Sequence, residues 1–367
     1  MTHASIAPGD RLYTNARVIV LSMNALLIML GFGIVAPSMA FYLIALEGGI
    51  TQPPGPGYMI SPEVVAKFSF VLGLMMAAFM GTRTLLARYW GGVSDRRGRR
   101  PIIIAGLIGY VLLLILFGLA RSWIDLLLIR GAQGVVSAMV WPTSEAALMD
   151  IVGPNRRAEG LGLYMLVSNV GFVAGPGVGG ILYNLCRDVL LLPVPDVFRV
   201  PYFIAAAIVV PSAIATWFVL GETIPAANSG HPPRSENPQT HGPDPPVAGP
   251  LHPPMSEKEL DSHTRRLVNV LYAMALANGV AMGMGQPLFQ LFLMSRITTD
   301  IAAIGFIVSG AGAVGMLFSI PAGRYSDAHG RKGIAVSGAI VARAGLFALP
   351  LTRDLSATGA VLSLIHI

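Results

Sequence analysis

The chain has 367 residues, of which 54% are hydrophobic and 12% are charged, and its mean hydropathy of +0.65 excludes an ordinary soluble domain. Its net charge of +6 does not indicate nucleic-acid binding, because the basic residues border apolar runs and form no continuous basic face. The single cysteine, Cys186, excludes an internal disulfide. Many apolar runs reach the roughly 20 residues that a spanning helix needs, so we expect an all-α, polytopic protein embedded in the lipid bilayer.

Apolar runs predict nine complete spanning helices and part of a tenth. They cover residues 16–46, 64–90, 101–120, 123–149, 159–186, 199–220, 266–295, 299–322 and 333–350, and the tenth begins near Ala357. Residues 222–265 are rich in Pro, His, Ser and Asn, a composition that cannot bury a core and predicts a flexible linker. The linker separates a six-helix half, residues 1–221, from a truncated second half, residues 266–361.

The last six residues, 362–367 (LSLIHI), match the translation of a transposon-end adapter used in sequencing-library preparation. We therefore expect them to be an adapter scar, and we expect the natural protein to continue through further helices.

The distribution of Arg and Lys predicts the orientation in the bilayer. With the N-terminus in the cytoplasm, the inner loops and adjoining helix ends hold sixteen basic residues, whereas the outer ones hold six. The positive-inside rule then places the N-terminus and the linker in the cytoplasm. No signal peptide or organelle-targeting segment is recognised, so we expect a multi-pass protein of a prokaryotic plasma membrane.

A short polar segment occurs twice, as GGVSDRRGRR from Gly91 and as GRYSDAHGRK from Gly323. We expect the first glycine of each copy to allow close approach of helix backbones, the second to adopt the positive φ of a tight turn, and the aspartate to cap a helix or pair with a cation. Two related membrane halves are indicated, although any inter-helix loop can contain Gly, Asp and Arg. The matched positions are Gly91, Asp95, Gly98, Arg99 and Arg100, and Gly323, Asp327, Gly330, Arg331 and Lys332.

The first copy, including Arg96, resembles the loop signature of the major facilitator superfamily of secondary transporters. The resemblance implies two six-helix bundles and a substrate site between them, with both loops acting as the cytoplasmic gate. It also implies that Asp150 pairs with Arg96 or Arg99, while a solvated carboxylate at a helix end is equally compatible with the sequence.

The fourth predicted helix carries Arg130, Gln133 and Gly134 (RGAQG), which resemble the family's signature in that helix. A buried arginine in a span is a candidate functional residue, and the resemblance associates this position with proton transfer; snorkelling to the outer interface is the alternative. Glu145 is the one carboxylate clearly inside a predicted span, so it is a candidate proton carrier or a member of the gate's charge cluster. Arg83 and Arg343 are further cations in spans without an assigned partner, and Arg343 would suit either a distant acid or an anionic substrate.

The fifth predicted helix contains a long pattern of glycines around one proline. Such a pattern makes a groove for close helix packing, and it resembles the antiporter motif of drug:proton exchangers. Packing of small residues alone is the alternative. The pattern consists of Gly162, Gly171, Gly175, Pro176, Gly179 and Gly180.

Several polar, aromatic and methionine residues on the spans could line a central cavity, although each is more often a packing or helix-to-helix contact. They are Asn24, Asn169, Asn278, Gln286, Gln290, Phe32, Met76, Met165 and Phe289.

No enzyme constellation is present, and we expect no cofactor and no metal site. The combined motifs predict a monomeric secondary transporter that exports hydrophobic small molecules, cations among them, in exchange for protons. A nutrient symporter or uniporter of the same superfamily and a non-transporting receptor or scaffold are the alternatives.

Overall fold

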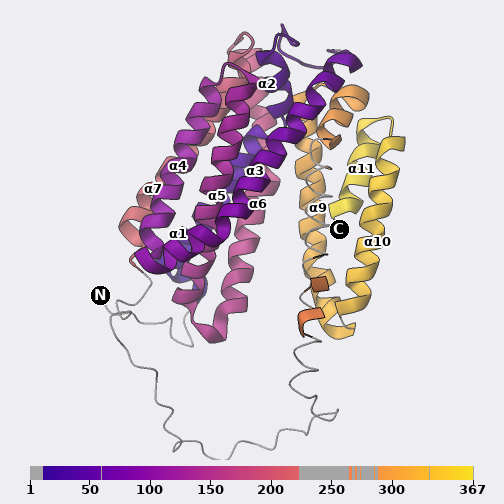
Figure 1. Ribbon diagram of the computed structural model, residues 1–367. Helices are drawn as coiled ribbons and strands as arrows, with labels where there is room; N and C mark the ends of the chain where they lie inside the picture. The colour runs from indigo at the N-terminus through magenta and orange to yellow at the C-terminus, as the bar shows by residue number, and fades with distance from the viewer. Residues whose placement is uncertain are drawn as a thin grey trace, which may run out of the picture. The chain divides into compact units, whose positions relative to one another are not determined.

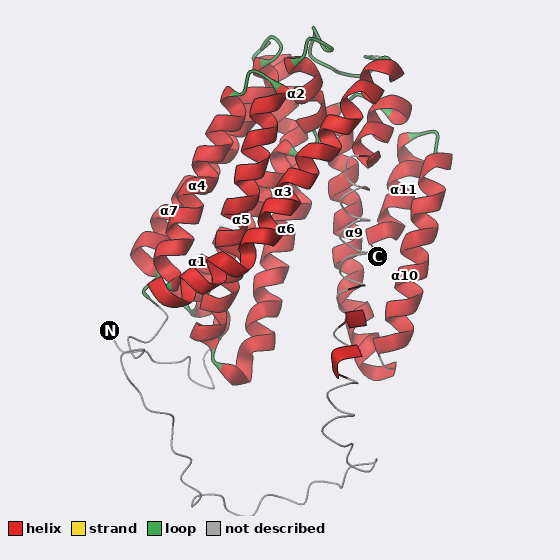
Figure 2. Cartoon of the chain, in the orientation of Figure 1, coloured by secondary structure: helices red, strands yellow, loops and turns green. Residues whose placement is uncertain are grey.

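The computed structural model describes residues 11–58, 60–222, 264–266, 269, 270, 273, 285, 288–329 and 331–366. Throughout these residues every regular element is a helix, with no strand among them, which confirms the all-α prediction (Figures 1 and 2). The chain divides into two compact units, Met1–Ile224 with Gln286–Ile367 and Pro225–Gly285. The site described below lies in the first unit.

The predicted N-terminal half contributes α1 (Ala16–Val35), α2 (Met39–Leu46), α3 (Pro62–Arg97), α4 (Arg99–Leu119), α5 (Trp123–Val152), α6 (Arg157–Asn184) and α7 (Asp196–Val219). The second half contributes α9 (Ile301–His329), α10 (Arg331–Ala348) and α11 (Leu355–His366). In the part of the chain that the structure describes, seven helices are long and apolar enough to cross a membrane. The prediction of a polytopic helical protein is thereby confirmed.

Two boundaries differ from the prediction in an informative way. The first predicted span breaks into α1 and α2 around Pro37, which has no N–H group to continue the helix. The second span does not end at residue 90 but runs to Arg97, and α4 begins at Arg99. The first copy of the repeated segment is therefore helical apart from a single-residue turn at Gly98. Most of the seventh predicted span and of the linker lies outside the described residues.

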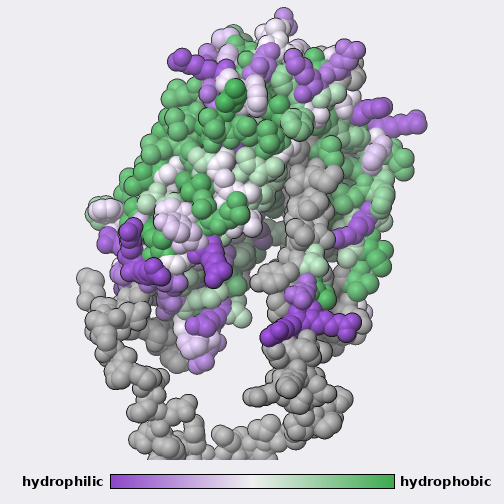
Figure 3. Space-filling view, viewed as in Figure 1, coloured by the Kyte–Doolittle hydropathy of each residue, from purple (hydrophilic) through white to green (hydrophobic). Residues whose placement is uncertain are grey.

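The helices alternate between two ends of the bundle. The basic end contains the α3–α4 turn, the α5–α6 turn at Gly153 and the end of α7, and the far end contains the α2–α3 and α6–α7 loops. Figure 3 shows hydrophobic side chains over much of the flank and strongly hydrophilic ones toward the ends. Large apolar side chains on the flank are openly exposed, among them Leu85 at 80% and Phe218 at 81%, as expected for a lipid-facing surface.

Buried aromatic residues join α2, α4, α6 and α7 near the far end. The Tyr202 ring packs 5.5 Å from the Tyr42 ring and 5.4 Å from the Phe117 ring, measured between centroids. The Tyr42 hydroxyl donates to the Phe117 carbonyl at 3.0 Å. This cluster makes α2, which is almost entirely buried, a fixed part of the N-terminal half.

In the second half, α11 begins at the far end, and Asp354 caps its first turn. The Asp354 carboxylate accepts hydrogen bonds from the Ala357 backbone N–H at 2.7 Å and from the Ser356 hydroxyl at 2.6 Å. These bonds hold the pKa of the Asp354 carboxyl below its usual value. The helix α11 that starts here continues through Leu362, which is buried.

Candidate functional site

At the basic end, Gly98 makes the whole turn between α3 and α4. Its φ of 101° lies in the region that side chains rarely adopt, as the sequence predicted for the second glycine of the repeated segment. A Cβ at this position would also collide with the Glu222 carboxylate. Two independent constraints therefore require glycine here.

Arg99 is the centre of the charged cluster at this end. Its guanidinium lies 2.5 Å from the Asp95 carboxylate and 3.3 Å from the Asp150 carboxylate, and it donates to the Ser94 hydroxyl at 3.1 Å. Of the two arginines that the resemblance allowed, Arg99 contacts Asp150, whereas Arg96 is exposed. Because the Asp95 side chain is 62% exposed, its pair with Arg99 contributes at most about 1 kcal/mol.

The end of α7 holds the same turn from the other side. The Arg99 backbone N–H donates to Glu222 at 2.8 Å, and the Arg100 guanidinium donates to the Trp217 carbonyl at 2.6 Å while lying 5.5 Å from the Trp217 ring centroid. Glu222 was expected to be the first residue of the linker, and its contact with this turn was not predicted. Its acidic side chain immediately after an apolar span was the available signal.

Not every residue of the repeated segment behaves as expected. No described atom lies within 4 Å of a Cβ built on Gly91, so the structure does not show the close backbone approach predicted there. In the second copy, α9 ends at His329 and α10 begins at Arg331. Gly330 and the side-chain surroundings of Gly323, Asp327, Arg331 and Lys332 lie outside the described residues, so their gating role stays a prediction.

Arg130 points into the bundle from α5. Its Nη1 donates to the Gln133 side-chain oxygen at 2.8 Å, and its guanidinium lies 5.6 Å from the ring centroids of both Phe32 and Phe117. These contacts to α1 and α4 favour an inward position over snorkelling. Gly134, four residues on, packs directly against the α3 backbone, where a Cβ would meet the Phe79 carbonyl.

Glu145 lies farther along α5 toward the basic end and is partly buried. Fifteen residues of helix separate it from Arg130, which corresponds to about 22 Å at the usual rise per residue. Among the described residues, the ion pairs of Arg99 are made with Asp95 and Asp150 and not with Glu145. The structure therefore places the two proton-coupling candidates at separate levels of the bundle.

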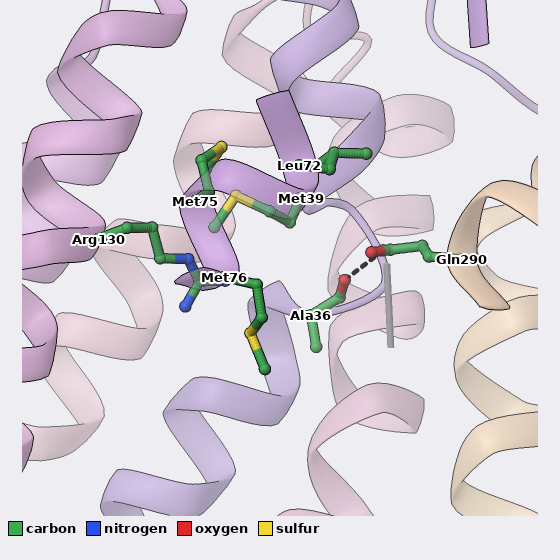
Figure 4. Close-up of a pocket in the computed structure, with 7 residues that line it drawn as sticks. All are labelled: Ala36, Met39, Leu72, Met75, Met76, Arg130 and Gln290. Carbon is green, nitrogen blue, oxygen red and sulfur yellow. Dashed lines mark hydrogen bonds between the residues drawn. The ribbon is translucent and has the colours of Figure 1, made fainter. Parts of the chain in front are cut away.

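A cavity opens beside Arg130 (Figure 4). Gln290 reaches it from the helical stretch Leu288–Ile297, and its Nε2 donates to the Ala36 carbonyl at 2.5 Å and to the Pro37 carbonyl at 3.0 Å. The break between α1 and α2 exposes these carbonyls, so the proline kink creates the acceptors that Gln290 uses. The cavity is lined by Ala36, Met39, Leu72, Met75, Met76, Arg130 and Gln290.

The predicted lining residues divide accordingly. Met76 and Gln290 line the cavity, and Phe32 packs against Arg130. Asn24 instead makes a buried hydrogen bond from its Nδ2 to the Thr216 hydroxyl at 2.8 Å, which is the helix-to-helix alternative. Asn169, Met165 and Phe289 are not among the lining residues, whereas Asn278 and Gln286 lie outside the described residues.

The glycines of α6 form two contact faces. Toward α1, a Cβ on Gly175 would lie 2.6 Å from the Gly33 Cα, and one on Gly179 would lie 2.9 Å from the Ile34 Cα. Gly171 meets the Leu26 carbonyl group in the same way. We call Gly171, Gly175 and Gly179 the α1 seam.

The other face of α6 packs against α9 of the second half. A Cβ on Gly180 would lie 2.7 Å from the Ala302 Cα, and Gly305 of α9 packs against the Pro176 carbonyl group. The Gly177 backbone N–H donates to the Ser309 hydroxyl at 2.8 Å. Gly180, Gly305 and Ser309 define the α9 seam. Gly162 has no described atom within 4 Å of its Cβ position and belongs to neither.

The loop between α2 and α3 makes contacts to both halves at the far end. The Pro54 carbonyl accepts from the Tyr183 hydroxyl at 2.8 Å and from Arg187 Nη1 at 3.1 Å. The Thr299 hydroxyl, just before α9, lies 2.6 Å from the Tyr58 carbonyl and 3.2 Å from the Gly55 carbonyl. We refer to residues 54–58 as the far-end strap.

Comparison with known proteins agrees with this arrangement. The family model described as Major Facilitator Superfamily matches residues 21–365. The chain belongs to the Major Facilitator Superfamily. This confirms the resemblance to the superfamily that the repeated segment carries.

Among relatives of this superfamily chain are the quinolone resistance protein NorA of Staphylococcus aureus, 26% identical over 59% of this chain and 48% of that protein, and multidrug resistance protein 2 of Bacillus subtilis, 26% identical over 56% of this chain and 44% of that protein. The chain therefore matches about half the length of these relatives. A bacterial homologue of the human lysosomal transporter Spinster, solved in an inward-facing and unoccupied conformation, has the same fold, with a TM-score of 0.64 at 18% identity over 98% of this chain and 74% of that one.

Proposed function

We propose that this chain is a secondary active transporter that exports hydrophobic, drug-like compounds in exchange for protons by alternating access. The observation that carries the proposal is the cavity, because residues of α2, α3 and α5 line it together with Gln290 of the second half. A substrate bound there would contact both halves and could be exposed to each side in turn. Its Met and Leu lining suits an apolar ligand.

Direction and coupling rest on further support. The glycine pattern of α6 resembles that of drug:proton exchangers, and the two relatives are named for quinolone resistance and multidrug resistance. Glu145 is a partly buried acid in a span and is our candidate proton carrier. The basic end would face the cytoplasm, together with the N-terminus and the linker, in a plasma membrane. There the Arg99 cluster would open and close the inner side, and a single copy would suffice for transport.

The test is dye efflux from proteoliposomes that contain the 367-residue chain. An imposed pH gradient should drive movement of a hydrophobic fluorescent dye, and a proton ionophore should abolish it. Glu145→Gln should uncouple dye movement from the gradient, whereas the matched control Glu159→Gln, which removes an exposed carboxylate paired with Arg156, should not. Gradient-driven uptake of a nutrient would support symport instead, and an absence of any gradient-dependent flux would favour a receptor or scaffold and overturn the proposal.

A further inference from the structure

The Arg130 guanidinium is a charged group at the cavity wall, and it has more hydrogen-bond donors than the described contacts use. It carries five N–H donors, and the structure commits one of them, on Nη1, to Gln133. The rings of Phe32 and Phe117 flank the guanidinium and restrict its orientation. Across the described residues no carboxylate lies within ion-pair distance of Arg130, since every ion pair there involves another arginine.

Within these 367 residues, the other predicted spans supply no compensating acid at that level. Cations in the spans are Arg83, Arg130 and Arg343, whereas Glu145 is the one carboxylate well inside a span. Glu145 lies about 22 Å away along α5. The sequence from Arg266 to Thr299, which includes the seventh predicted span, contains no Asp or Glu. The cavity therefore has a net positive wall.

The other lining residues are apolar or already engaged. Met39, Met75 and Met76 have flexible side chains that can adapt to ligands of different outline. Gln290 uses its amide nitrogen on the Ala36 and Pro37 carbonyls. Figure 4 shows Met75, Met76 and Arg130 gathered on one side of this space and Gln290 on the other. One localised positive charge thus faces an adaptable apolar surface.

We infer that this cavity selects amphiphilic organic anions, with a carboxylate of the ligand on the Arg130 guanidinium and its apolar body against the methionine wall. Arginine presents its donors in a fork that matches a carboxylate with two parallel hydrogen bonds. A desolvated, unpaired guanidinium is costly, and the ligand's charge would remove that cost. A cation with the same apolar body would add a second positive charge to the cavity. This inference rests on the proposed function and narrows its substrate class.

Three probes with one apolar body and different charge test the inference: 1-pyrenebutyrate, its methyl ester and (4-pyren-1-ylbutyl)trimethylammonium. Each is titrated at neutral pH against the 367-residue chain in nanodiscs of phosphatidylcholine, whose headgroups carry no net charge. We expect the carboxylate to bind about tenfold or more tightly than the ester, and the ammonium to bind weakest. Equal affinities, or tighter binding of the ammonium, would overturn the inference.

Matched variants locate the effect. Arg130→Gln should lower carboxylate affinity about tenfold and leave ester affinity unchanged. Arg121→Gln removes a positive charge near the start of the same helix, outside the cavity lining, and should change neither. Unchanged carboxylate affinity in Arg130→Gln would refute the role of Arg130. If Arg130→Gln does not fold, two other results test the inference: the ranking of the three probes on the wild-type chain, and the carboxylate affinity of the charge-preserving Arg130→Lys variant.

Transport of the same probes separates the two proposals. If none moves under a pH gradient, the proposed transport function fails. If all move with no preference for the carboxylate, transport stands and the inference about charge selectivity fails.

Discussion

Both faces of α6 pack through glycine, but one face packs against α1 of the same half and the other against α9 of the second half. On the α1 seam, main chain meets main chain over three successive turns, from Gly171 to Gly179, inside one half of the protein. On the α9 seam, Gly180 and Gly305 also allow backbone contact, but the partner helix belongs to the other half and one hydrogen bond, from Gly177 to Ser309, crosses the contact.

The difference indicates which contact is fixed and which can move. The α1 seam has no side chain that could change rotamer to accommodate a shift, so α1 and α6 should behave as one rigid body. The α9 seam combines small residues with a single polar bond that can be remade as helices slide. A rocking motion between halves would therefore use the α9 seam, and substitutions in the two seams should have different effects.

The largest effect is expected for Gly175→Ala. The new Cβ would lie 2.6 Å from the Gly33 Cα and 2.9 Å from the Leu30 carbonyl oxygen, and neither belongs to a side chain that can move aside. We expect a loss of about 3 kcal/mol in the free energy of unfolding, at the upper end of typical overpacking costs. Equilibrium unfolding in mixed micelles measures this loss, and wild-type stability in the variant would disprove a rigid α1 seam.

Gly305→Ala should have a smaller effect on stability and a larger effect on conformation. The added Cβ would meet the Pro176 carbonyl group, but α9 can shift away as part of the second half. We expect a loss of about 1 to 2 kcal/mol and a wider separation of α5 and α9. Spin labels at Leu128 and Leu317, both exposed, would report that separation. A loss as large as that of Gly175→Ala, without any change in distance, would make the two seams equivalent.

Ser309→Ala tests the polar bond of the α9 seam alone. Removing the hydroxyl leaves the Gly177 N–H without this acceptor, and we expect a cost of about 1 kcal/mol. Ser319→Ala is the control in the same helix, because its hydroxyl bonds to the Met316 carbonyl within α9. Thermal unfolding of both variants compares their losses of stability. Equal losses would show that the bond from Gly177 to Ser309 does not stabilise the α9 seam.

Gly162→Ala should have the smallest effect and the opposite sign. Gly162 is exposed and has no described neighbour within 4 Å of its Cβ position, so alanine adds helix propensity of up to about 1 kcal/mol without a clash. A stability equal to or above that of wild type is expected in the same unfolding assay. Marked destabilisation would show that Gly162 is required for stability although no described atom lies within 4 Å of its Cβ position.

Much of this arrangement is accessible from the sequence because it depends on local patterns. Hydrophobic run length predicts the spans, and the offsets around Gly98 predict its positive φ, since both follow from the chemistry of neighbouring residues. The break between α1 and α2 at Pro37 appears only in the structure, because the sequence predicts one continuous span over residues 16–46.

The sequence does not identify which residue each of these groups contacts. A glycine pattern indicates that some backbone comes close, but it does not say that Gly175 meets α1 while Gly180 meets α9. The sequence likewise does not identify the partner of each charged side chain. Arg96 and Arg99 are equally basic, and only the structure shows that Arg99, the first residue of α4 after the Gly98 turn, contacts Asp150. Glu222 was missed because its partner, the Arg99 N–H, is distant in sequence and belongs to the main chain.

The far-end strap is held through its carbonyl oxygens. Tyr183, Arg187 and Thr299 all donate to main-chain acceptors of Pro54, Gly55 or Tyr58, so no strap side chain is needed for these bonds. Every residue type supplies a carbonyl, whereas a deletion would move all the acceptors out of register. During divergence, the length of this segment should therefore be constrained. Gly55, where a Cβ would lie 2.7 Å from Arg187 Nη1, and Gly57, whose φ is 80°, should also be retained, so the exposed Pro56 is the position where substitution, and with it a new epitope, should be tolerated best.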